Sequence, residues 1–194
     1  MELEALIANA IRARVIDPAQ HGPLMRNARR VAQRANIPMR ALFTSVVGVV
    51  TDTEYDWVKA YRQHASDGTA GLLITAIKPA RPILDRFSAI AAWAIRNSVR
   101  AQVLLLQDVF ALLKEGEAPD PELLLIPDFV TEGLAVQAWQ ASQLSSLLYG
   151  RYAAGHQTVL YVQAELADAY KTVDRAYGVL MAQHVRDHFE KGTE

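Results

Sequence analysis

Residues 71–95, GLLITAIKPARPILDRFSAIAAWAI, decide how the rest of the sequence is interpreted. GLLIT is a short apolar run, typical of a buried parallel strand. The following segment has helical apolar spacing, with Asp85 as its expected N-cap. The loop between strand and helix contains two prolines and no glycine. Strand, loop and helix in this order can form a phosphate site at the start of the helix, so the loop's composition decides whether this one does.

Similar alternation continues downstream of this stretch. Short apolar runs predict strands at residues 72–76, 102–106, 123–126 and 158–162. Helical patterns follow at residues 109–114 and 136–152. Strands that alternate with helices at this spacing predict an α/β fold with a mostly parallel sheet, in which helices cover both faces.

Upstream of residue 71 the pattern is helical. Apolar residues recur at helical spacing over residues 2–15, 24–34 and 51–64. We therefore expect a short helical segment over residues 1–50 and an α/β core over residues 51–194. The span RRVAQRANIPMRALFTSVVG also permits a helix-turn-helix, with its turn at Ile37 and Pro38.

Composition indicates an ordinary globular protein. Hydrophobic residues make up 51% of the 194 residues and charged residues 21%, and cysteine is absent. The absence of cysteine excludes disulfides, thiolate metal sites and cysteine nucleophiles, and it fits a reducing cytoplasm. The first residues lack the basic region of a secretory signal, and no apolar run has the length of a membrane span. We expect a cytoplasmic protein without membrane contact.

Charge is distributed unevenly although the net charge is only −1. Residues 1–50 carry seven arginines against three acids, whereas residues 115–150 carry six acids and no lysine or arginine. A basic segment can bind nucleic acid or an acidic protein surface. The candidate contact residues are Arg26, Arg29, Arg30, Arg34 and Arg40.

Several segments resemble one family in the order in which they occur. They are RANIPMRALFTS, WVKAYRQHASDGTAGLLITA, RAQVLLLQDVFALLKE, PELLLIPDFVTEGLAVQAWQASQLSSLLYGRYAAGHQTVLYV and YGVLMAQHV, within residues 29–189. This order resembles the DnaC/IstB-like helicase-loader branch of AAA+ P-loop ATPases. The resemblance implies a three-layer αβα P-loop NTPase-like core. In active relatives the N-terminal helices grip a replicative helicase or a transposase, while the core oligomerises and tracks single-stranded DNA.

The phosphate-loop position lacks the groups that would hold a phosphate. A P-loop needs glycines, whose backbone N–H groups converge on phosphate, and a Lys-Ser/Thr pair. No glycine lies between Gly71 and Gly116, and Leu84 and Asp85 stand where the resemblance places the Lys-Thr pair. Lys78 and Arg81 are basic and nearby, which permits a weak anion site, although solvated surface residues are the simpler interpretation.

The other catalytic positions of the family are also altered. Pro127 replaces the metal-holding acid of the Walker B strand, and Asp128 stands at the second acid, where a turn-capping role is the simpler interpretation. Gln163 matches the sensor position, and His184 falls at the arginine-finger position, where we expect an ordinary surface histidine. His184 and His188 form HVRDH rather than HExxH, so no zinc site is expected.

We therefore predict a degenerate, catalytically inactive AAA+ protein without a cofactor. Its predicted function is an adaptor that binds a replicative helicase, an active AAA+ ATPase or a recombination protein in replication or mobile-element biology, as in a phage. Oligomerisation is compatible with this function. The alternatives are direct DNA or RNA binding through the basic N-terminal helices and an ATPase with a non-standard phosphate loop.

Overall fold

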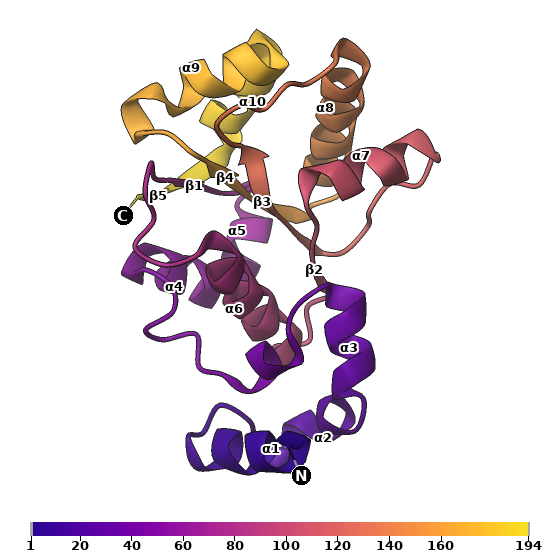
Figure 1. Ribbon diagram of the computed structural model, residues 1–194, viewed down its shortest axis with the longest axis vertical. Helices are drawn as coiled ribbons and strands as arrows, with labels where there is room; N and C mark the ends of the chain where they lie inside the picture. Colours follow the sequence, from indigo (N-terminus) through magenta and orange to yellow (C-terminus); the bar gives the residue numbers. More distant parts are fainter. Residues whose placement is uncertain (1, 194) are drawn as a thin grey trace.

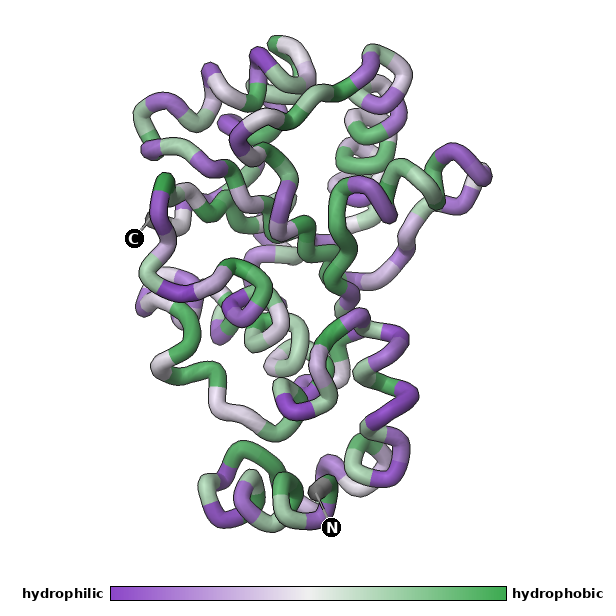
Figure 2. The backbone as a smooth tube through the Cα atoms, in the orientation of Figure 1, coloured by the Kyte–Doolittle hydropathy of each residue, from purple (hydrophilic) through white to green (hydrophobic). Residues whose placement is uncertain are grey.

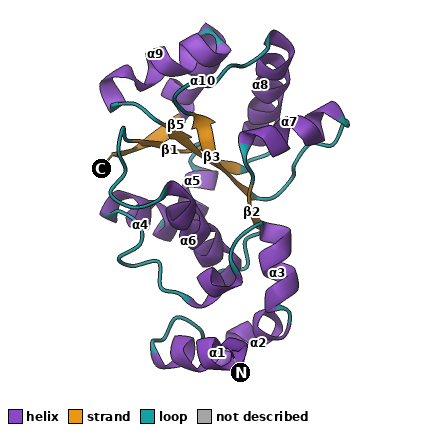
Figure 3. Ribbon diagram, viewed as in Figure 1, coloured by secondary structure: helices purple, strands orange, loops and turns teal. Residues whose placement is uncertain are grey.

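A five-stranded parallel sheet forms the centre of the computed structural model, with strand order β2-β3-β4-β1-β5 (Figures 1 and 3). The structure describes residues 2–193. The strands are β1 (Gly71–Thr75), β2 (Ala101–Val103), β3 (Leu123–Val130), β4 (Gln157–Val162) and β5 (Phe189–Thr193). The first four lie where the sequence predicts strands, whereas β5 was not predicted. The expected α/β fold with a parallel sheet is confirmed.

Helices cover both faces of this sheet (Figure 1). On one face lie α1 (Glu2–Arg12), α2 (Pro18–Arg26), α3 (Ala28–Ala35), the 3-10 helix η1 (Met39–Phe43), α4 (Asp52–Lys59), α5 (Tyr61–Ser66) and α6 (Ile83–Arg96). On the other face lie α7 (Leu106–Lys114), α8 (Ala138–Ala153), α9 (Leu166–Tyr177) and α10 (Val179–His188). The molecule is therefore a three-layer αβα structure.

Strands β1, β3 and β4 consist largely of buried hydrophobic residues because both of their faces are covered (Figure 2). Side chains of successive strand residues enter opposite cores: Leu72 and Ile74 pack with the helices from α1 to α6, and Leu73 packs with α7 to α10. At the start of β1 a Cβ on Gly71 would lie 1.7 Å from the Thr158 carbonyl oxygen. Only glycine therefore permits this close approach of β1 to β4.

The N-terminal helices pack on the same core as α6. Ala28, Ala32 and Ala35 of α3 and Leu42 of η1 are buried in the cluster that contains Ile90. The boundary at residue 50 stays a prediction, since the hydrophobic contacts continue across it. Within residues 2–193, no helix combines the length and apolar composition that crossing a membrane requires.

The helix-turn-helix alternative was wrong. The chain turns at Asn36, whose φ is 53°, but the next element is η1, a 3-10 helix of five residues. Leu42 and Phe43 of η1 are buried. The apolar spacing of this segment therefore reflects attachment to the core rather than an exposed recognition helix.

Candidate functional site

The β1–α6 loop, residues 76–82, lies at the carboxyl end of β1, where open α/β sheets bind ligands. Lys78 and Arg81 are exposed in this loop, and Leu84 and Asp85 are exposed in the first turn of α6. Between Gly71 and Gly116 the only residue with positive φ is Ser98, which lies after α6. A backbone nest that alternates right-handed and left-handed residues is therefore absent from this loop.

The expected N-cap of α6 was wrong. The helix begins at Ile83 with Pro82 in the N-cap position, and Asp85 lies inside the first turn. A carboxylate there interacts favourably with the helix dipole and repels a phosphate. Asp85 therefore occupies the place where an anion would bind.

The first basic residue of α6, Arg86, faces the core. Its Nη2 lies 2.7 Å from Glu54 Oε1, and its Nε lies 3.1 Å from Glu54 Oε1 and 3.2 Å from Oε2. The side chains of Arg86 and Glu54 are 2% and 0% exposed. Glu54 also accepts a hydrogen bond from the Thr51 N–H at 2.8 Å, in a capping box that starts α4. The pair thus joins α4 to α6 beneath the loop.

Sequence reasoning missed this ion pair. Thr51 and Glu54 have the S/T-x-x-E spacing of a capping box, which was the available signal for the start of α4. No sequence signal connects Glu54 to Arg86, because the two residues are 32 positions apart.

The Asp128 carboxylate forms a structural hydrogen bond with the backbone of α7. β3 continues through Pro127 to Val130, and its pairing with β4 is irregular between Ile126 and Val130. The Asp128 Oδ1 accepts a hydrogen bond from the Leu106 N–H, the first of α7, at 2.8 Å. Burial raises the pKa of the Asp128 carboxyl above its ordinary value, although this hydrogen bond opposes the shift. Asp128 therefore caps the start of α7.

Gln163 follows β4 and links it to the segment after β3. Its Oε1 accepts a hydrogen bond from the Glu132 N–H at 3.0 Å, and its own N–H donates to the Val130 carbonyl at 2.8 Å. A cleft of ≈ 510 Å³ opens beside it at the carboxyl ends of the strands. The charged residues that line this cleft are Glu132, Glu165, Asp168 and Arg175. Three acids against one arginine disfavour a polyphosphate there.

His184 is buried, so its prediction as a surface histidine was wrong. Only 2% of the residue is exposed, and neither ring nitrogen has a hydrogen-bond partner among the described residues. Its ring centroid lies 4.2 Å from that of Tyr149 and 5.1 Å from that of His188. Burial lowers the pKa of His184 to about 4, and the neighbouring His188 contributes to this lowering. His184 is therefore neutral at pH 7 and faces the core between α8 and α10.

The residues beside this histidine pair have other partners. Asp187 pairs with Arg186 at 3.0 Å, and Glu190 of β5 pairs with His64 of α5 at 2.5 Å. In the part of the chain that the structure describes, no group of three or more His, Cys, Asp or Glu side chains is placed to hold a metal ion.

The candidate contact arginines gather at the N-terminal helices. Ala28, Ala32 and Ala35 turn one side of α3 to the core, which leaves its arginines on the opposite side. The five candidate arginines are Arg26 at the end of α2, Arg29, Arg30 and Arg34 on α3, and Arg40 on η1. The structure thus collects them on neighbouring elements, and Arg40 also lines a pocket with Arg81 of the β1–α6 loop and Asp85 of α6.

Solved structures with a similar fold include a helicase loader and a DNA replication initiation factor. The DnaC helicase loader superposes with a TM-score of 0.58 at 15% identity, over 73% of this chain and 85% of that chain. DnaI gives a TM-score of 0.56 at 12% identity, over 81% and 90% of the two chains. AMPPCP-bound DnaA from Aquifex aeolicus gives 0.52 at 12% identity, over 77% of this chain and 49% of that one. No protein-family model matches the chain, and no curated protein matches it in sequence.

The strand order, the parallel sheet and these superpositions agree on one architecture. At identities of 10–15% the comparison establishes the fold and leaves activity to the individual residues. The chain therefore has the α/β fold of AAA+ P-loop proteins, the fold of helicase loaders.

Proposed function

We propose that this protein is a non-hydrolysing AAA+-fold adaptor that binds a protein partner in DNA replication or a related recombination process. The observation that carries the proposal is a helicase-loader fold whose β1–α6 loop lacks positive φ angles and whose first α6 cation, Arg86, is bound to Glu54. Partners of the expected kind are a replicative helicase, an active AAA+ ATPase or a recombination protein.

Three further positions support inactivity. Asp128 caps α7, His184 is buried and neutral, and Glu132 belongs to an acidic cleft at the carboxyl edge of the sheet. Phosphoryl transfer needs a magnesium-holding carboxylate and cations that stabilise the transferring phosphate. Asp128 is used as a helix cap and His184 carries no positive charge at pH 7, so we assign the adaptor function to surfaces rather than to chemistry.

Nucleotide binding separates the adaptor from an ATPase with a non-standard phosphate loop. Calorimetry of the full chain with magnesium and ATP at up to about 1 mM is expected to give no saturable heat. A Kd below about 0.1 mM would contradict inactivity at this loop and support the ATPase alternative.

Partner binding tests the adaptor role directly. A tagged full chain recovered from its source organism should retain a helicase, AAA+ ATPase or recombination protein after nuclease treatment. The purified partner should then bind the chain, and Arg29→Glu/Arg30→Glu should weaken that binding by about tenfold. Arg62→Glu/Arg175→Glu makes the same charge change elsewhere and should leave binding intact. Recovery of no such protein contradicts the adaptor role.

Direct nucleic-acid binding is the second candidate, favoured by the five arginines on α2, α3 and η1. If all five contact phosphates, log K should fall against log salt with a slope of about −4.5 on duplex DNA. Arg29→Gln should make that slope shallower by about one. Absence of a gel shift at low salt excludes this candidate, and a partner that is lost on nuclease treatment supports it.

A further inference from the structure

A groove of ≈ 520 Å³ lies between α3, the end of α6 and the edge strand β2. Val31, Ala35 and Val99 contribute apolar surface to it. Arg34 from α3 and Arg100, which directly precedes β2, also line it, and both residues are exposed. Neither guanidinium has a carboxylate within ion-pair distance among the described residues. We call this surface the basic groove.

An acidic turn, residues 115–120, adjoins the basic groove. Gly116, with φ of 80°, ends α7 in a Schellman motif, in which the Glu117 N–H donates to the Leu112 carbonyl at 2.9 Å. Glu115 and Glu117 are exposed, and neither forms an ion pair among the described residues. The Schellman motif fixes the direction in which the chain leaves α7, and therefore the position of Glu115 and Glu117.

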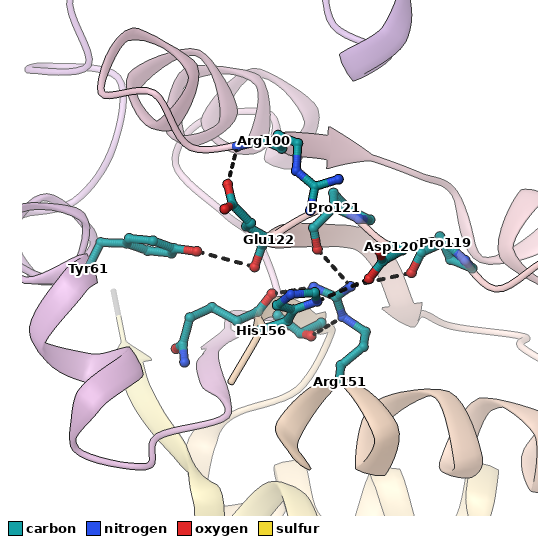
Figure 4. A network of polar contacts seen from close by, with 10 residues as sticks. Tyr61, Arg100, Pro119, Asp120, Pro121, Glu122, Arg151 and His156 are labelled. Atoms are coloured by element: carbon teal, nitrogen blue, oxygen red, sulfur yellow. Dashed lines mark hydrogen bonds and ion pairs between the residues drawn. The ribbon is translucent and has the colours of Figure 1, made fainter. Parts of the chain in front are cut away.

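The other end of the acidic turn is held by Arg151, which is 4% exposed in α8 (Figure 4). Arg151 Nη1 donates to the carbonyl oxygens of Pro121 at 2.9 Å and Pro119 at 3.4 Å. The remaining donors reach the Thr158 Oγ1 and the Gln157 carbonyl. A turn held at both ends loses little conformational entropy when it binds a partner.

The acidic turn and the basic groove meet at Asp120 and Pro121. Asp120 is the last residue of the acidic turn, Pro121 follows it, and both line the basic groove. Asp120 is the acid in the groove, and it is paired with His156 at 3.2 Å. The chain thus places the cations Arg34 and Arg100 near the acidic turn, and neither these arginines nor Glu115 and Glu117 form an ion pair among the described residues. A two-fold axis between two such patches would lay each acidic turn on the opposite basic groove.

We propose that two copies of this chain associate through this surface, with Glu115 and Glu117 of one copy facing Arg34 and Arg100 of the other. A nucleic acid is a poorer occupant for two reasons. The neighbouring carboxylates repel phosphate, and no aromatic side chain lines the groove to stack a base. The dimer does not depend on the adaptor function, because it involves no nucleotide and no helicase.

Analytical ultracentrifugation of the full chain tests the dimer. At about 100 µM protein and about 0.05 M salt we expect a dimer, which should weaken about tenfold at about 0.5 M salt as the charges are screened. A monomer under the low-salt conditions overturns the proposal and leaves the adaptor function untouched. Association that does not respond to salt also overturns it.

Charge exchange tests which residues form the interface. In Arg34→Glu/Arg100→Glu both the groove and the turn are acidic. In Glu115→Lys/Glu117→Lys both the groove and the turn are basic. Each variant alone should be monomeric, and a mixture of the two should form a heterodimer, because both contacts are then complementary.

The matched control is Arg62→Glu/Arg175→Glu, which has the same net charge as the first variant and should dimerise like the wild type. Failure of the mixture to associate overturns the assignment of the interface. A circular dichroism spectrum of each variant establishes that the change has left the fold intact. A wild-type chain that dimerises only when an oligonucleotide is added overturns the protein–protein contact in favour of a nucleic-acid bridge.

Discussion

Removing Arg86 should reveal how strongly the α4–α6 ion pair supports the fold. The change Arg86→Met keeps most of the side-chain volume but leaves the Glu54 carboxylate at 0% exposure without its cation. Breaking a buried pair by deleting one partner typically destabilises a protein by about 3–5 kcal/mol, since an uncompensated charge stays buried. We expect a loss in this range, measured by urea unfolding followed by circular dichroism with an unchanged m-value.

The double variant Glu54→Gln/Arg86→Met separates the unpaired charge from lost packing. The introduced glutamine side chain is neutral, and its amide oxygen can still accept the hydrogen bond from the Thr51 N–H, which Glu54 accepts at 2.8 Å. The double variant should therefore be more stable than Arg86→Met, by about 1–3 kcal/mol. The exposed control Arg62→Met should change stability by less than about 0.5 kcal/mol. If Arg86→Met loses under about 1 kcal/mol, or the double variant loses more than the single one, the reasoning is refuted.

Three further predictions concern the stability of variants at buried positions. Because burial holds the pKa of His184 at about 4 and the unfolded value is about 6.5, the unfolded chain binds more protons between these pH values. The free energy of unfolding should fall by up to about 1.4 kcal/mol per pH unit as the pH drops through this window. His184→Phe should therefore flatten the plot of urea midpoint against pH. Equal slopes for the variant and the wild type contradict this expectation. Arg151→Met should destabilise by about 3 kcal/mol and increase amide exchange near residue 121, because buried carbonyls lose their donor; protection equal to that of the wild type contradicts this. Gly71→Ala should reduce thermal stability by about 3 kcal/mol or more, since its Cβ would overlap the Thr158 carbonyl, whereas Gly133→Ala has open space around its Cβ and should lose about 1 kcal/mol from its positive φ; equal melting temperatures refute the clash.

The strands were predictable where both faces are buried. β1, β3 and β4 each contain a continuous apolar run, as expected for strands that helices cover on two sides. β5, with the sequence FEKGT, pairs only with β1 at the edge of the sheet and carries Glu190 and Lys191. Its polar composition gave no strand signal, and only its position beside β1 makes it a strand.

The sequence predicted which residue types occupy the candidate site, but it did not predict which groups their side chains contact. The sequence indicated that the β1–α6 loop lacks glycine and that Asp128 stands beside a proline. The exposure of His184 was mispredicted, because its burial comes from Tyr149 and Tyr152 of another helix. Sequence periodicity reports the structure of a single segment, so it does not indicate which distant segments contact each other.

The sequence by itself determined the α/β class and the composition of the phosphate-loop position, because burial on two faces and the absence of glycine are local properties of the chain. The tertiary structure decided that Arg86 binds Glu54, that Asp128 caps α7 and that the acidic turn adjoins the basic groove. Each of these depends on the distance between groups brought together by packing, and electrostatic and hydrogen-bond energies depend on that distance.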